Sequence, residues 1–487
     1  MSRKNTGGMK VALRWRRTKI VATLGPASSR ASGIADLVAA GVDVFRVNMS
    51  HGEPEIHRKT VERIRRVAAR VGRHIAILMD LCGPKIRVGS FRDGCITLDE
   101  GQRITVTTRP VLGEDNLIPS QYRSLHKDLK KGERILLDDG KLELRVLGVD
   151  GTEIQCKVVY GGVLSNHKGM NLPNSELSTT ALTSKDRKDV QLGVDLGVDF
   201  FALSFVRAAR DVQQLQRYLA RLKADIPVIS KIERPEAVDN ICEIMDVSYG
   251  IMIARGDLGI ELPAEKVPLI QTDLIAKARQ KGIPVIVATQ MLESMMQQTR
   301  PTRAEVTDVA GAAMMSTDAV MLSGETAVGK YPVQSVRTMD RVLREVERHQ
   351  WELGSFASEP ILKRGQKVYF IRESMAHAAV QMSQDLGLET IVVPTSTGTT
   401  ARIMAAHRPL APQVGASDYA MICRRLALHW GVVPVQIKES QKDWRQICIH
   451  IDACCGLAQP GHDILLVSGF REDPAESEPV LKILHLQ

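Results

Sequence analysis

Charged residues follow two apolar segments of this sequence. In PVISKIE, residues 227–233, Lys231 and Glu233 alternate at the end of an apolar run, and Asp257 follows the next such run in YGIMIARGDLG, residues 249–259. Side chains two positions apart on a strand point to the same face of the sheet. Charged groups at the end of a buried strand need a partner, a ligand or a metal ion. Two carboxylates beside a lysine suit Mg²⁺ and a small phosphorylated acid.

Other apolar segments also end in polar residues, which fits one rim shared by several strands. Fixed positive charges on such a rim favour phosphoryl transfer, which depends on positioning and on neutralisation of charge. The backbone amides of Gly256 and Asp257 are placed to grip a carboxylate, whereas Arg255 and Glu325 can instead brace the rim through ion pairs. No GxxxxGK[ST] or GxGxxG motif occurs. The rim residues are Arg46, Asn48, Ser50, His51, Asp80, Lys85, Arg87, Lys231, Glu233, Arg255, Gly256, Asp257, Thr289, Gln290, Ser323 and Glu325.

Eight near-continuous apolar segments can position these residues as parallel strands that are covered on both faces. Amphipathic stretches such as residues 55–72 and 267–282 separate most of them and are predicted to be helices. Eight βα units are the number that closes a barrel, so we predict an α/β fold with a (β/α)8 TIM barrel. The segments are residues 19–25, 42–52, 74–85, 198–206, 227–233, 249–259, 284–290 and 318–326.

One connection is far too long for a single helix. The sequence after the third segment alternates apolar and polar residues and contains Asp-Gly turns at 139–140 and 150–151. This pattern predicts an inserted all-β domain, a β-barrel lid over residues 89–184 that hinges over the barrel mouth. The barrel then takes residues 18–88 and 185–355, after an N-terminal arm of residues 1–17.

A third region follows the long helix predicted over residues 331–353. Residues 356–487 are predicted to form a C-terminal α/β domain, with a helix over 374–388 and strands in 390–400 and 463–470. The loop from Thr395 to Thr400 is rich in hydroxyl groups and glycine. Such a loop can bind phosphate through backbone N–H groups, or it can be an ordinary strand-to-helix turn.

Composition narrows the classes of protein. The 487 residues include 65 basic and 56 acidic ones, and the resulting charge of +9 is weak evidence for nucleic-acid binding, because phosphorylated small molecules would use such a balance equally well. The basic cluster from Arg14 to Lys19 can be interpreted as a solvated N-terminal arm or, equally well, as a functional feature. The eight cysteines form no CxxC pair, no signal-peptide pattern is seen, and no apolar run reaches the ~20 residues of a membrane span. We therefore expect a cytoplasmic protein with reduced thiols and no membrane partner.

The sequence resembles pyruvate kinases over almost its whole length. The spacing of MIARGDLG, ATQMLESM and RAEVTDVA is the most specific part of the match. The matching stretches are RRTKIVATLGPAS (16–28), FRVNMSHG (45–52), DLCGPKIRVG (80–89), GGVLSNHKGMNLP (161–173), LTSKDRKDV (182–190), SKIERPEAV (230–238), MIARGDLGIELP (252–263), ATQMLESM (288–295), RAEVTDVA (303–310) and MLSGETAVGKYP (321–332).

The resemblance implies transfer of the phosphoryl group of phosphoenolpyruvate to ADP, which gives ATP and pyruvate in the last step of glycolysis. Glu233 and Asp257 would bind Mg²⁺, for which Mn²⁺ can substitute. Lys231 would stabilise the migrating phosphoryl group and the enolate, and Thr289 would relay a proton to that enolate. Arg46 would bind the transferred phosphate. Gly256 and Asp257 would also contact the substrate.

The same resemblance implies a nucleotide site and a regulatory domain. Asn48, His51, Arg87 and Lys168 are expected to meet ADP or ATP when the lid closes. In the C-terminal domain, Thr395, Ser396, Thr397 and Thr400 align with a loop that binds a small phosphorylated effector, unless the site is vestigial. The family usually assembles as a homotetramer.

One departure from the family pattern concerns a monovalent cation. Many members bind K⁺ through an Asn, a Ser and an Asp with a neighbouring Thr, and they carry Glu in GPEIR. This chain keeps Asn48, Ser50 and Asp80, but it has Leu81 in place of the Thr and Lys85 in place of the Glu. The ammonium group of Lys85 would replace the charge of K⁺, so K⁺ is not expected to be required.

Two other classes of function fit parts of the sequence. Metal-dependent barrel aldolases also place a Glu/Asp pair on Mg²⁺ at the rim, but they give no role to Lys231 or to the inserted domain. A basic nucleic-acid-binding protein would use the Arg14–Arg17 cluster, and its binding would weaken with salt. That class leaves the rim residues unexplained.

Overall fold

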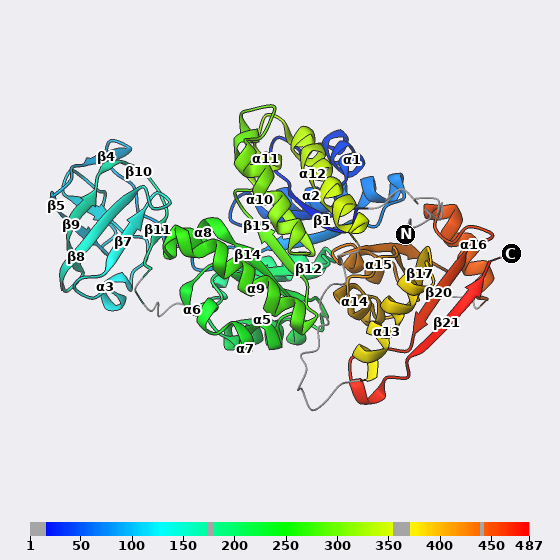
Figure 1. Cartoon of the computed structure of the whole chain (residues 1–487). Coiled ribbons are helices and arrows are strands. Elements are labelled where there is room, and N and C mark those ends of the chain that lie inside the picture. The colour runs from blue at the N-terminus through cyan, green and yellow to red at the C-terminus, as the bar shows by residue number, and fades with distance from the viewer. Residues whose placement is uncertain (1–15, 174, 176–179, 354–370, 439–442, 487) are drawn as a thin grey trace, which may run out of the picture.

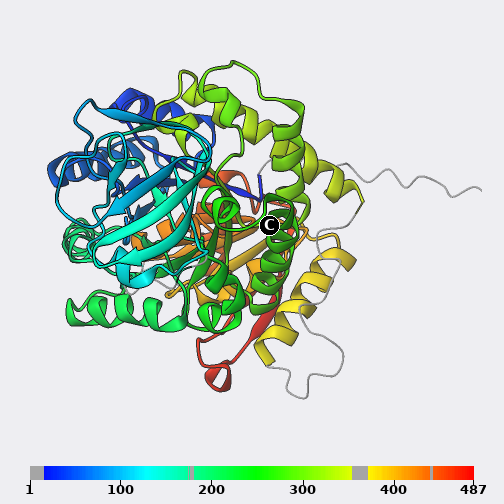
Figure 2. The same cartoon turned by 90° about the vertical axis from the view of Figure 1, so that its left-hand side faces the viewer.

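The computed structural model describes residues 16–173, 175, 180–353, 371–438 and 443–486. Three parts lie in a row, with a β-rich lid on one side, the barrel in the middle and a C-terminal domain on the other side (Figure 1). The lid lies in front of the barrel when the molecule is viewed from the lid side (Figure 2). Among the described residues, no helix is long and apolar enough to cross a membrane.

Eight parallel strands form a closed barrel in the order β1-β16-β15-β14-β13-β12-β3-β2. The predicted (β/α)8 barrel is confirmed, and each apolar segment singled out in the sequence contains one of its strands. Side chains such as Phe200 and Met252 fill the interior, so the barrel is a packed core. The strands are β1 (Lys19–Thr23), β2 (Val44–Asn48), β3 (Ala76–Asp80), β12 (Phe200–Leu203), β13 (Val228–Ile232), β14 (Gly250–Ala254), β15 (Val285–Ala288) and β16 (Ala319–Leu322).

Helices cover the outside of this barrel, and local sequence signals set their ends. Thr183 and Thr302 begin α4 and α10 with capping boxes, while Gly72 and Gly282 end α2 and α9 at φ of 64° and 66°. The helices are α1 (Ala31–Ala40), α2 (Pro54–Val71), α4 (Ser184–Asp195), α5 (Ala209–Arg221), α6 (Pro235–Asp239), α7 (Ile241–Val247), α8 (Arg255–Glu261), η1 (Ala264–Lys266), α9 (Val267–Lys281), η2 (Glu293–Met296), α10 (Arg303–Met314), α11 (Gly324–Ala327) and α12 (Pro332–Glu352).

The lid lies between β3 and β12 in sequence and has its own apolar core. It contains a six-stranded sheet and a two-stranded sheet, and both predicted Asp-Gly turns join antiparallel neighbours. A short helix, α3 (Leu125–Asp128), interrupts the predicted all-β pattern. The strands are β4 (Cys95–Leu98), β5 (Arg103–Thr107), β6 (Leu117–Pro119), β7 (Arg134–Leu137), β8 (Leu142–Asp150), β9 (Glu153–Tyr160), β10 (Gly162–Ser165) and β11 (Met170–Asn171).

The C-terminal domain is a five-stranded sheet in the order β19-β18-β17-β20-β21, with only the β20–β21 pair antiparallel. It packs against the amino-terminal ends of the barrel strands, where Lys19 Nζ donates to the carbonyl of Val432 at 2.7 Å. Its elements are α13 (Ile371–Asp385), β17 (Thr390–Pro394), α14 (Thr399–Ala406), β18 (Gln413–Ser417), α15 (Ala420–Leu426), β19 (Val432–Gln436), α16 (Trp444–Cys455), β20 (Asp463–Ser468), η3 (Pro474–Glu476) and β21 (Val480–His485).

The interpretation of the basic cluster as a solvated arm is wrong for the residues that the structure describes. Arg16 and Arg17 are 9% and 3% exposed. Arg16 forms ion pairs with Asp43 and Asp340, and Glu347 accepts hydrogen bonds from the backbone N–H of Arg17 at 2.7 Å. Paired acidic groups from distant segments therefore allow these charges to be buried. The first fifteen residues lie outside the described part.

Candidate active site

The carboxyl ends of β13 and β14 bring the first three candidate residues to one place. Lys231 lies on β13 and pairs in register with Met252 of β14. Glu233 follows β13 directly, and Asp257 lies in the first turn of α8, which begins immediately after β14. Adjacent parallel strands thus deliver a lysine and two carboxylates to the same rim, as the alternation in the sequence predicted.

Lys231 is buried and is held by three oxygen atoms. Its Nζ lies 2.8 Å from Glu233 Oε1 and 3.3 Å from Asp80 Oδ1, and it donates to Ser204 Oγ at 2.7 Å. Burial disfavours its charged form, but the carboxylates of Asp80 and Glu233 outweigh burial and raise its pKa. The amine therefore stays protonated, and its position on the rim is fixed.

Asp80 links Lys231 to Arg46. Asp80 is 1% exposed, and its Oδ2 lies 2.6 Å from the guanidinium group of Arg46. Burial opposes ionisation of Asp80, yet Lys231 and Arg46 lower its pKa below the ordinary value. Arg46 also donates to Thr23 Oγ1 at 3.1 Å. Asp80 is thus shared by two cations, Lys231 and Arg46, and it holds both of them on the rim.

Asp257 and Glu233 have the chemistry of a divalent-metal site. Burial and then the charge of Glu233 raise the pKa of Asp257 to about 6. A cation between the two carboxylates would remove this repulsion, so both side chains fit Mg²⁺. Among the described residues, no group of three or more His, Cys, Asp or Glu side chains is arranged to hold a metal. Two protein carboxylates leave the other positions around the ion to water and substrate oxygens.

Thr289 faces the same rim from the end of β15. Its Oγ1 accepts the backbone N–H of Gly256 at 2.7 Å and donates to the carbonyl of Ala288 at 2.6 Å. A Cβ atom at position 256 would lie 3.3 Å from Thr289 Oγ1, so a larger residue there would press on the Thr289 side chain. Thr289 and Gln290 have φ of 67° and 54°, an uncommon conformation for non-glycine residues. Strained backbone of this kind occurs often at functional sites.

Two rim residues act as braces, Arg255 through the kind of ion pair that one reading of the sequence proposed and Glu325 through backbone hydrogen bonds instead. Arg255 pairs with Asp308 at 2.6 Å and donates to the carbonyl of Thr289 at 2.7 Å. Glu325 accepts the backbone N–H groups of Leu292 and Ser323 at 3.1 and 2.7 Å. Both side chains are satisfied within the protein, so they hold the loops that carry Thr289.

The candidate nucleotide residues are brought together only in part. Burial, followed by the charges of Arg87, Lys85 and Arg46, lowers the pKa of His51, which places these four groups near one another. Arg87 donates to the carbonyl of His167 in the lid at 2.8 Å. The ammonium group of Lys168 instead lies 2.7 Å from Asp138 within the lid.

Part of the monovalent-cation region lies beside Lys231. Asp80 contacts Lys231, as described above, and the carbonyl of buried Leu81 accepts a hydrogen bond from Ser204 at 2.8 Å. Asn48 accepts the backbone N–H of Ser50 at 3.1 Å. The charge of Lys85 acts on both His51 and Asp257, so its ammonium group lies over the same rim.

Sequence reasoning missed two contributors. Ser204 follows β12 directly, and a polar residue after the apolar run FFAL was the signal that could have marked it. Arg234 is 2% exposed and lies 3.2 Å from Glu261. It also donates to the carbonyls of Leu172 and Ser175, where the chain returns from the lid. No local pattern predicts this contact, because it depends on where the lid is placed.

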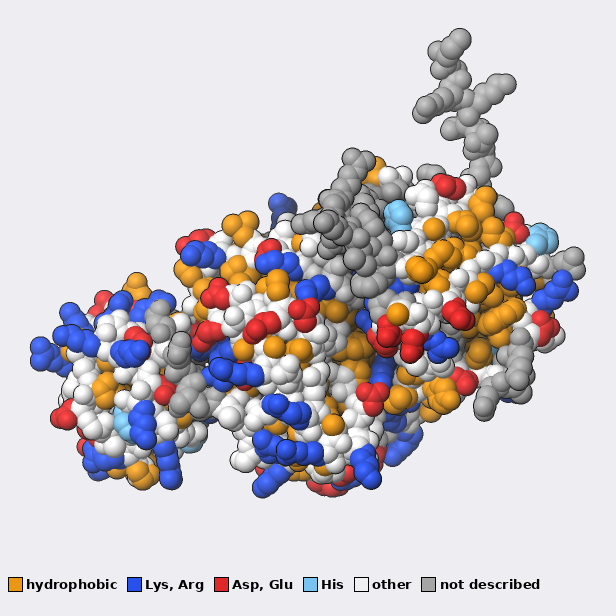
Figure 3. Space-filling model, turned by 90° about the horizontal axis from the view of Figure 1, so that it is seen from below, with side chains coloured by type: hydrophobic (Ala, Val, Ile, Leu, Met, Phe, Trp, Pro, Cys, Tyr) orange, Lys and Arg blue, Asp and Glu red, His pale blue; other side chains and the backbone are white. Residues whose placement is uncertain are grey.

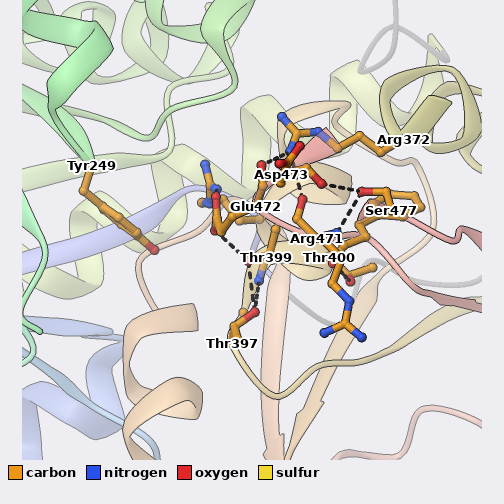
Figure 4. A network of polar contacts seen from close by, with 12 residues as sticks. Tyr249, Arg372, Thr397, Thr399, Thr400, Arg471, Glu472, Asp473 and Ser477 are labelled. Atoms are coloured by element: carbon orange, nitrogen blue, oxygen red, sulfur yellow. Dashed lines mark hydrogen bonds and ion pairs between the residues drawn. The ribbon is translucent and has the colours of Figure 1, made fainter. Parts of the chain in front are cut away.

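The candidate effector residues lie in the C-terminal domain, away from the rim. Thr395 Oγ1 accepts the backbone N–H of Gly398 at 2.9 Å, and Thr400 donates to the carbonyl of Phe470 at 3.4 Å. Thr397 Oγ1 accepts the backbone N–H of Thr399 at 3.4 Å (Figure 4). The hydroxyl groups of Thr395 and Thr397 thus accept backbone N–H groups of the strand-to-helix turn.

Comparisons with known proteins agree with this arrangement. The family model for the pyruvate kinase barrel domain matches residues 15–336, and that for the pyruvate kinase alpha/beta domain matches residues 373–484. Pyruvate kinase 2 of Synechocystis is 40% identical over 474 residues, covering 96% of this chain and 79% of that protein. A pyruvate kinase of Thermococcus litoralis is 40% identical over 455 residues, which cover 93% of this chain and 95% of that protein. The crystal structure of a pyruvate kinase from Cryptosporidium parvum has a TM-score of 0.88 at 34% identity, covering 97% of this chain and 96% of that one.

Proposed function

This chain belongs to the pyruvate kinase family, and from that premise we propose that it transfers the phosphoryl group of phosphoenolpyruvate to ADP at the barrel rim. One observation carries the proposal: a buried, protonated Lys231 lies 2.8 Å from Glu233, next to a second carboxylate whose pKa is raised to about 6. This is the charge arrangement that a metal-bound phosphorylated acid needs. A cation with two carboxylates alone would also suit an aldolase, but the family match favours the kinase.

Glu233 and Asp257 would hold Mg²⁺, or Mn²⁺ in its place, and the bound ion would neutralise charge on the substrate carboxylate and phosphate. Lys231 would exchange its contact with Glu233 for the bridging and phosphoryl oxygens. Its fixed ammonium group would then stabilise the migrating phosphoryl group and the enolate. The Lys231–Glu233 ion pair is thus a resting contact of both side chains.

Arg46 and Thr289 have roles on either side of the reacting atoms. Arg46 is supported by Asp80, so its guanidinium group would orient the transferred phosphate without losing its position. The hydroxyl group of Thr289 is too weak an acid to protonate the enolate alone, so we expect it to relay a proton from water. The Gly256 N–H now donates to Thr289 Oγ1 at 2.7 Å, and it would leave that hydroxyl group to donate to the substrate carboxylate.

The lid would supply the nucleotide side of the reaction. Asn48, His51 and Arg87 would bind ADP phosphates together with Lys168, which would leave Asp138 when the lid closes. Closure would exclude water that could intercept the phosphoryl group. Asn171 Nδ2 already donates to Glu261 on α8 at 3.0 Å, which supports close approach of lid and rim.

We expect activity without K⁺, because the ammonium group of Lys85 would replace its charge. Replacement of K⁺ by tetramethylammonium should leave the rate of the native enzyme nearly unchanged. The Lys85→Gln variant should lose most activity in tetramethylammonium and regain part of it in K⁺, measured as pyruvate formed per second. A large loss of native activity without K⁺ would reject the proposal. The exposed Lys188→Gln variant serves as the control.

Regulation and assembly extend the proposal. The loop that contains Thr395, Ser396, Thr397 and Thr400 would bind a small phosphorylated effector that activates the enzyme. Exposed Val480 and Ile483 on the edge strand β21 support assembly through the C-terminal domain as a homotetramer. The proposed place in glycolysis implies action in the cytoplasm, which the eight free thiols fit.

The test of the proposed reaction is pyruvate formation from phosphoenolpyruvate. It should require both ADP and Mg²⁺, and ATP should form in equal amount. Glu233→Gln should lose activity and bind Mn²⁺ more weakly, as seen by electron paramagnetic resonance. Asp239→Asn removes an exposed carboxylate nearby and should change neither. Pyruvate formation without ADP, or unchanged Mn²⁺ affinity in Glu233→Gln, would contradict the assignment.

A further inference from the structure

The first turn of α4 supports both loops that carry candidate nucleotide residues. Lys185 Nζ donates to the carbonyl of Met49 at 2.7 Å, in the loop after β2 (residues 49–53). The next residue, Asp186, accepts the backbone N–H of Gly83 through its Oδ1 at 3.1 Å, in the loop after β3 (residues 81–94). One turn of one helix therefore fixes the two loops whose residues are expected to meet ADP.

Met49 connects the loop after β2 to the catalytic rim. It is 1% exposed, and its backbone N–H donates to the carbonyl of Asp80 at 2.9 Å. The side chain of Asp80 in turn holds Lys231 and Arg46. The backbone of Met49 is thus tied to the end of β3 through its N–H and to α4 through its carbonyl. Lys185 supplies the second of these two attachments.

Lys185 is poorly placed to stabilise its own helix. A cation in the first turn of a helix faces the positive end of the helix dipole. The ion pair of Lys185 with Asp189, at 2.6 Å, places the lysine before the acid at i,i+4, which is the less favourable order on a helix. The side chain of Lys185 is 53% exposed, and yet its ammonium group donates to a main-chain carbonyl. Support of the loop after β2 therefore accounts for this lysine better than stability of α4 does.

Asp189 and His57 complete the support of this loop. Asp189 is buried, and its carboxylate accepts the hydrogen bond that directs the ammonium group of Lys185. Burial lowers the pKa of His57 on α2, and the charge of Asp189 opposes this effect, which places the two groups near each other. A Cβ atom at position 52 would lie 3.3 Å from two atoms of the His57 ring, so the ring packs directly against Gly52. Side chains from α2 and α4 thus hold the loop at both of its ends.

We propose that Lys185 is a positioning residue for the nucleotide, because it holds the loop after β2 at a fixed place relative to the loop after β3. The inference rests on the proposed kinase function and adds a residue that acts through the loop rather than on the substrate. Loss of the Lys185 contact releases the loop after β2 from α4, whereas Asp186 still holds the loop after β3. Lys231 and Asp257 come from other parts of the rim, so binding of phosphoenolpyruvate changes much less than binding of ADP.

The test measures steady-state kinetics of pyruvate formation for the native chain and Lys185→Met. The KM for ADP should rise about tenfold in this variant, because a hydrogen bond from a charged group is lost. The KM for phosphoenolpyruvate should stay within about twofold of the native value. Lys185→Arg keeps a cation that can reach the same carbonyl, so it should regain part of the affinity for ADP. Lys188→Met removes an exposed lysine from the same helix and should match the native chain.

A double variant separates positioning from a general loss of stability. Lys185→Met combined with Asp189→Asn leaves no unpaired buried carboxylate, and it should show the same rise in the KM for ADP as Lys185→Met alone. A native KM for ADP in either of these variants, equal rises in the two KM values, or no regain in Lys185→Arg overturns this inference while the proposed reaction stands. A native chain that forms no pyruvate from phosphoenolpyruvate and ADP overturns the proposed reaction and this inference with it.

Discussion

At the scale of single residues, the site depends on charges that are buried in pairs. Lys231 is buried, so Asp80, Glu233 and the Ser204 hydroxyl group stabilise its charge. This arrangement leaves the ammonium group preorganised, which is the condition for electrostatic catalysis in a protein site. A neutral side chain of similar length would fill the space but would not supply the charge.

Lys231→Met should lower turnover by several orders of magnitude and change the affinity for phosphoenolpyruvate little, because the charge acts mainly in the transition state. Steady-state kinetics of pyruvate formation measures the turnover, and a separate binding experiment measures the affinity for phosphoenolpyruvate. Lys188→Met on the exposed face of α4 is the matched control. A Lys231→Met enzyme that keeps more than about a tenth of native turnover is incompatible with this role.

At the scale of elements, a buried ion pair within the barrel also holds the lid through hydrogen bonds. Arg234 follows the metal-ligand candidate Glu233 directly, and it bridges Glu261 on α8 to the returning chain at Leu172 and Ser175. Because Asn171 also contacts Glu261, the lid strand β11 and the metal site share one support. The position of the lid is therefore tied to the loop that carries Glu233.

Arg234→Met should destabilise the protein by about 3–5 kcal/mol, because Glu261 would remain as a buried, unpaired charge. It should also raise the KM for ADP more than the KM for phosphoenolpyruvate, since the lid loses its anchor. Denaturant unfolding and steady-state kinetics measure the two effects. Arg210→Met removes an exposed arginine and should change neither. Should Arg234→Met not fold, Asn171→Ala tests the lid contact alone, and an unchanged KM for ADP in that variant contradicts the link.

The sequence predicts the elements of this molecule better than the contacts between them. Apolar runs and Asp-Gly turns marked the barrel strands and the lid hairpins, because those signals are local. The partners of Arg16 and Arg234 come from segments far away in the chain. Local sequence therefore indicated a solvated Arg16, and it gave no sign that Arg234 contributes to the site. Lys168 was assigned to the nucleotide, but its contact with Asp138 depends on the fold of the lid.

At the scale of the whole molecule, buried histidines lie where the barrel meets the C-terminal domain. His429 is 2% exposed and His407 is 8% exposed. Burial and then neighbouring cations lower the pKa of His429 to about 3, while burial and then His377 lower that of His407 to about 4. Both histidines are therefore neutral in the folded protein. In the unfolded chain they bind protons more readily, so folding in acid requires that these protons are released.

Acid should accordingly weaken the fold. Below the ordinary histidine pKa of 6.5, the unfolded chain binds more protons than the folded one, so stability falls as pH decreases. Each histidine should lower the free energy of unfolding by about 2 kcal/mol when the pH falls from 7 to 5. Denaturant unfolding at both pH values measures the loss, and His429→Asn should reduce it by about half. Equal pH dependence in the native chain and this variant would show that His429 does not titrate as assigned.

Assembly belongs to the same scale. Figure 3 shows hydrophobic side chains gathered over the part of the surface that holds the C-terminal domain, and β21 is the edge strand of its sheet with Ile483 at 44% exposed. Unprotected apolar edges favour pairing with another chain. Ile483→Lys should shift the proposed tetramer towards smaller species in light scattering, whereas Val149→Lys on the lid should not. A tetramer that Ile483→Lys leaves unchanged would exclude this edge as an interface.

The place of the lid insertion also bears on how the chain folds. β3 and β12 are hydrogen-bonded neighbours, with Phe200 opposite Leu78, although the whole lid separates them along the chain. The entropic penalty of joining two strands grows with the length of free chain between them. A lid that collapses first on its own core shortens that free length, so the barrel seam is expected to close late and to depend on prior folding of the insert.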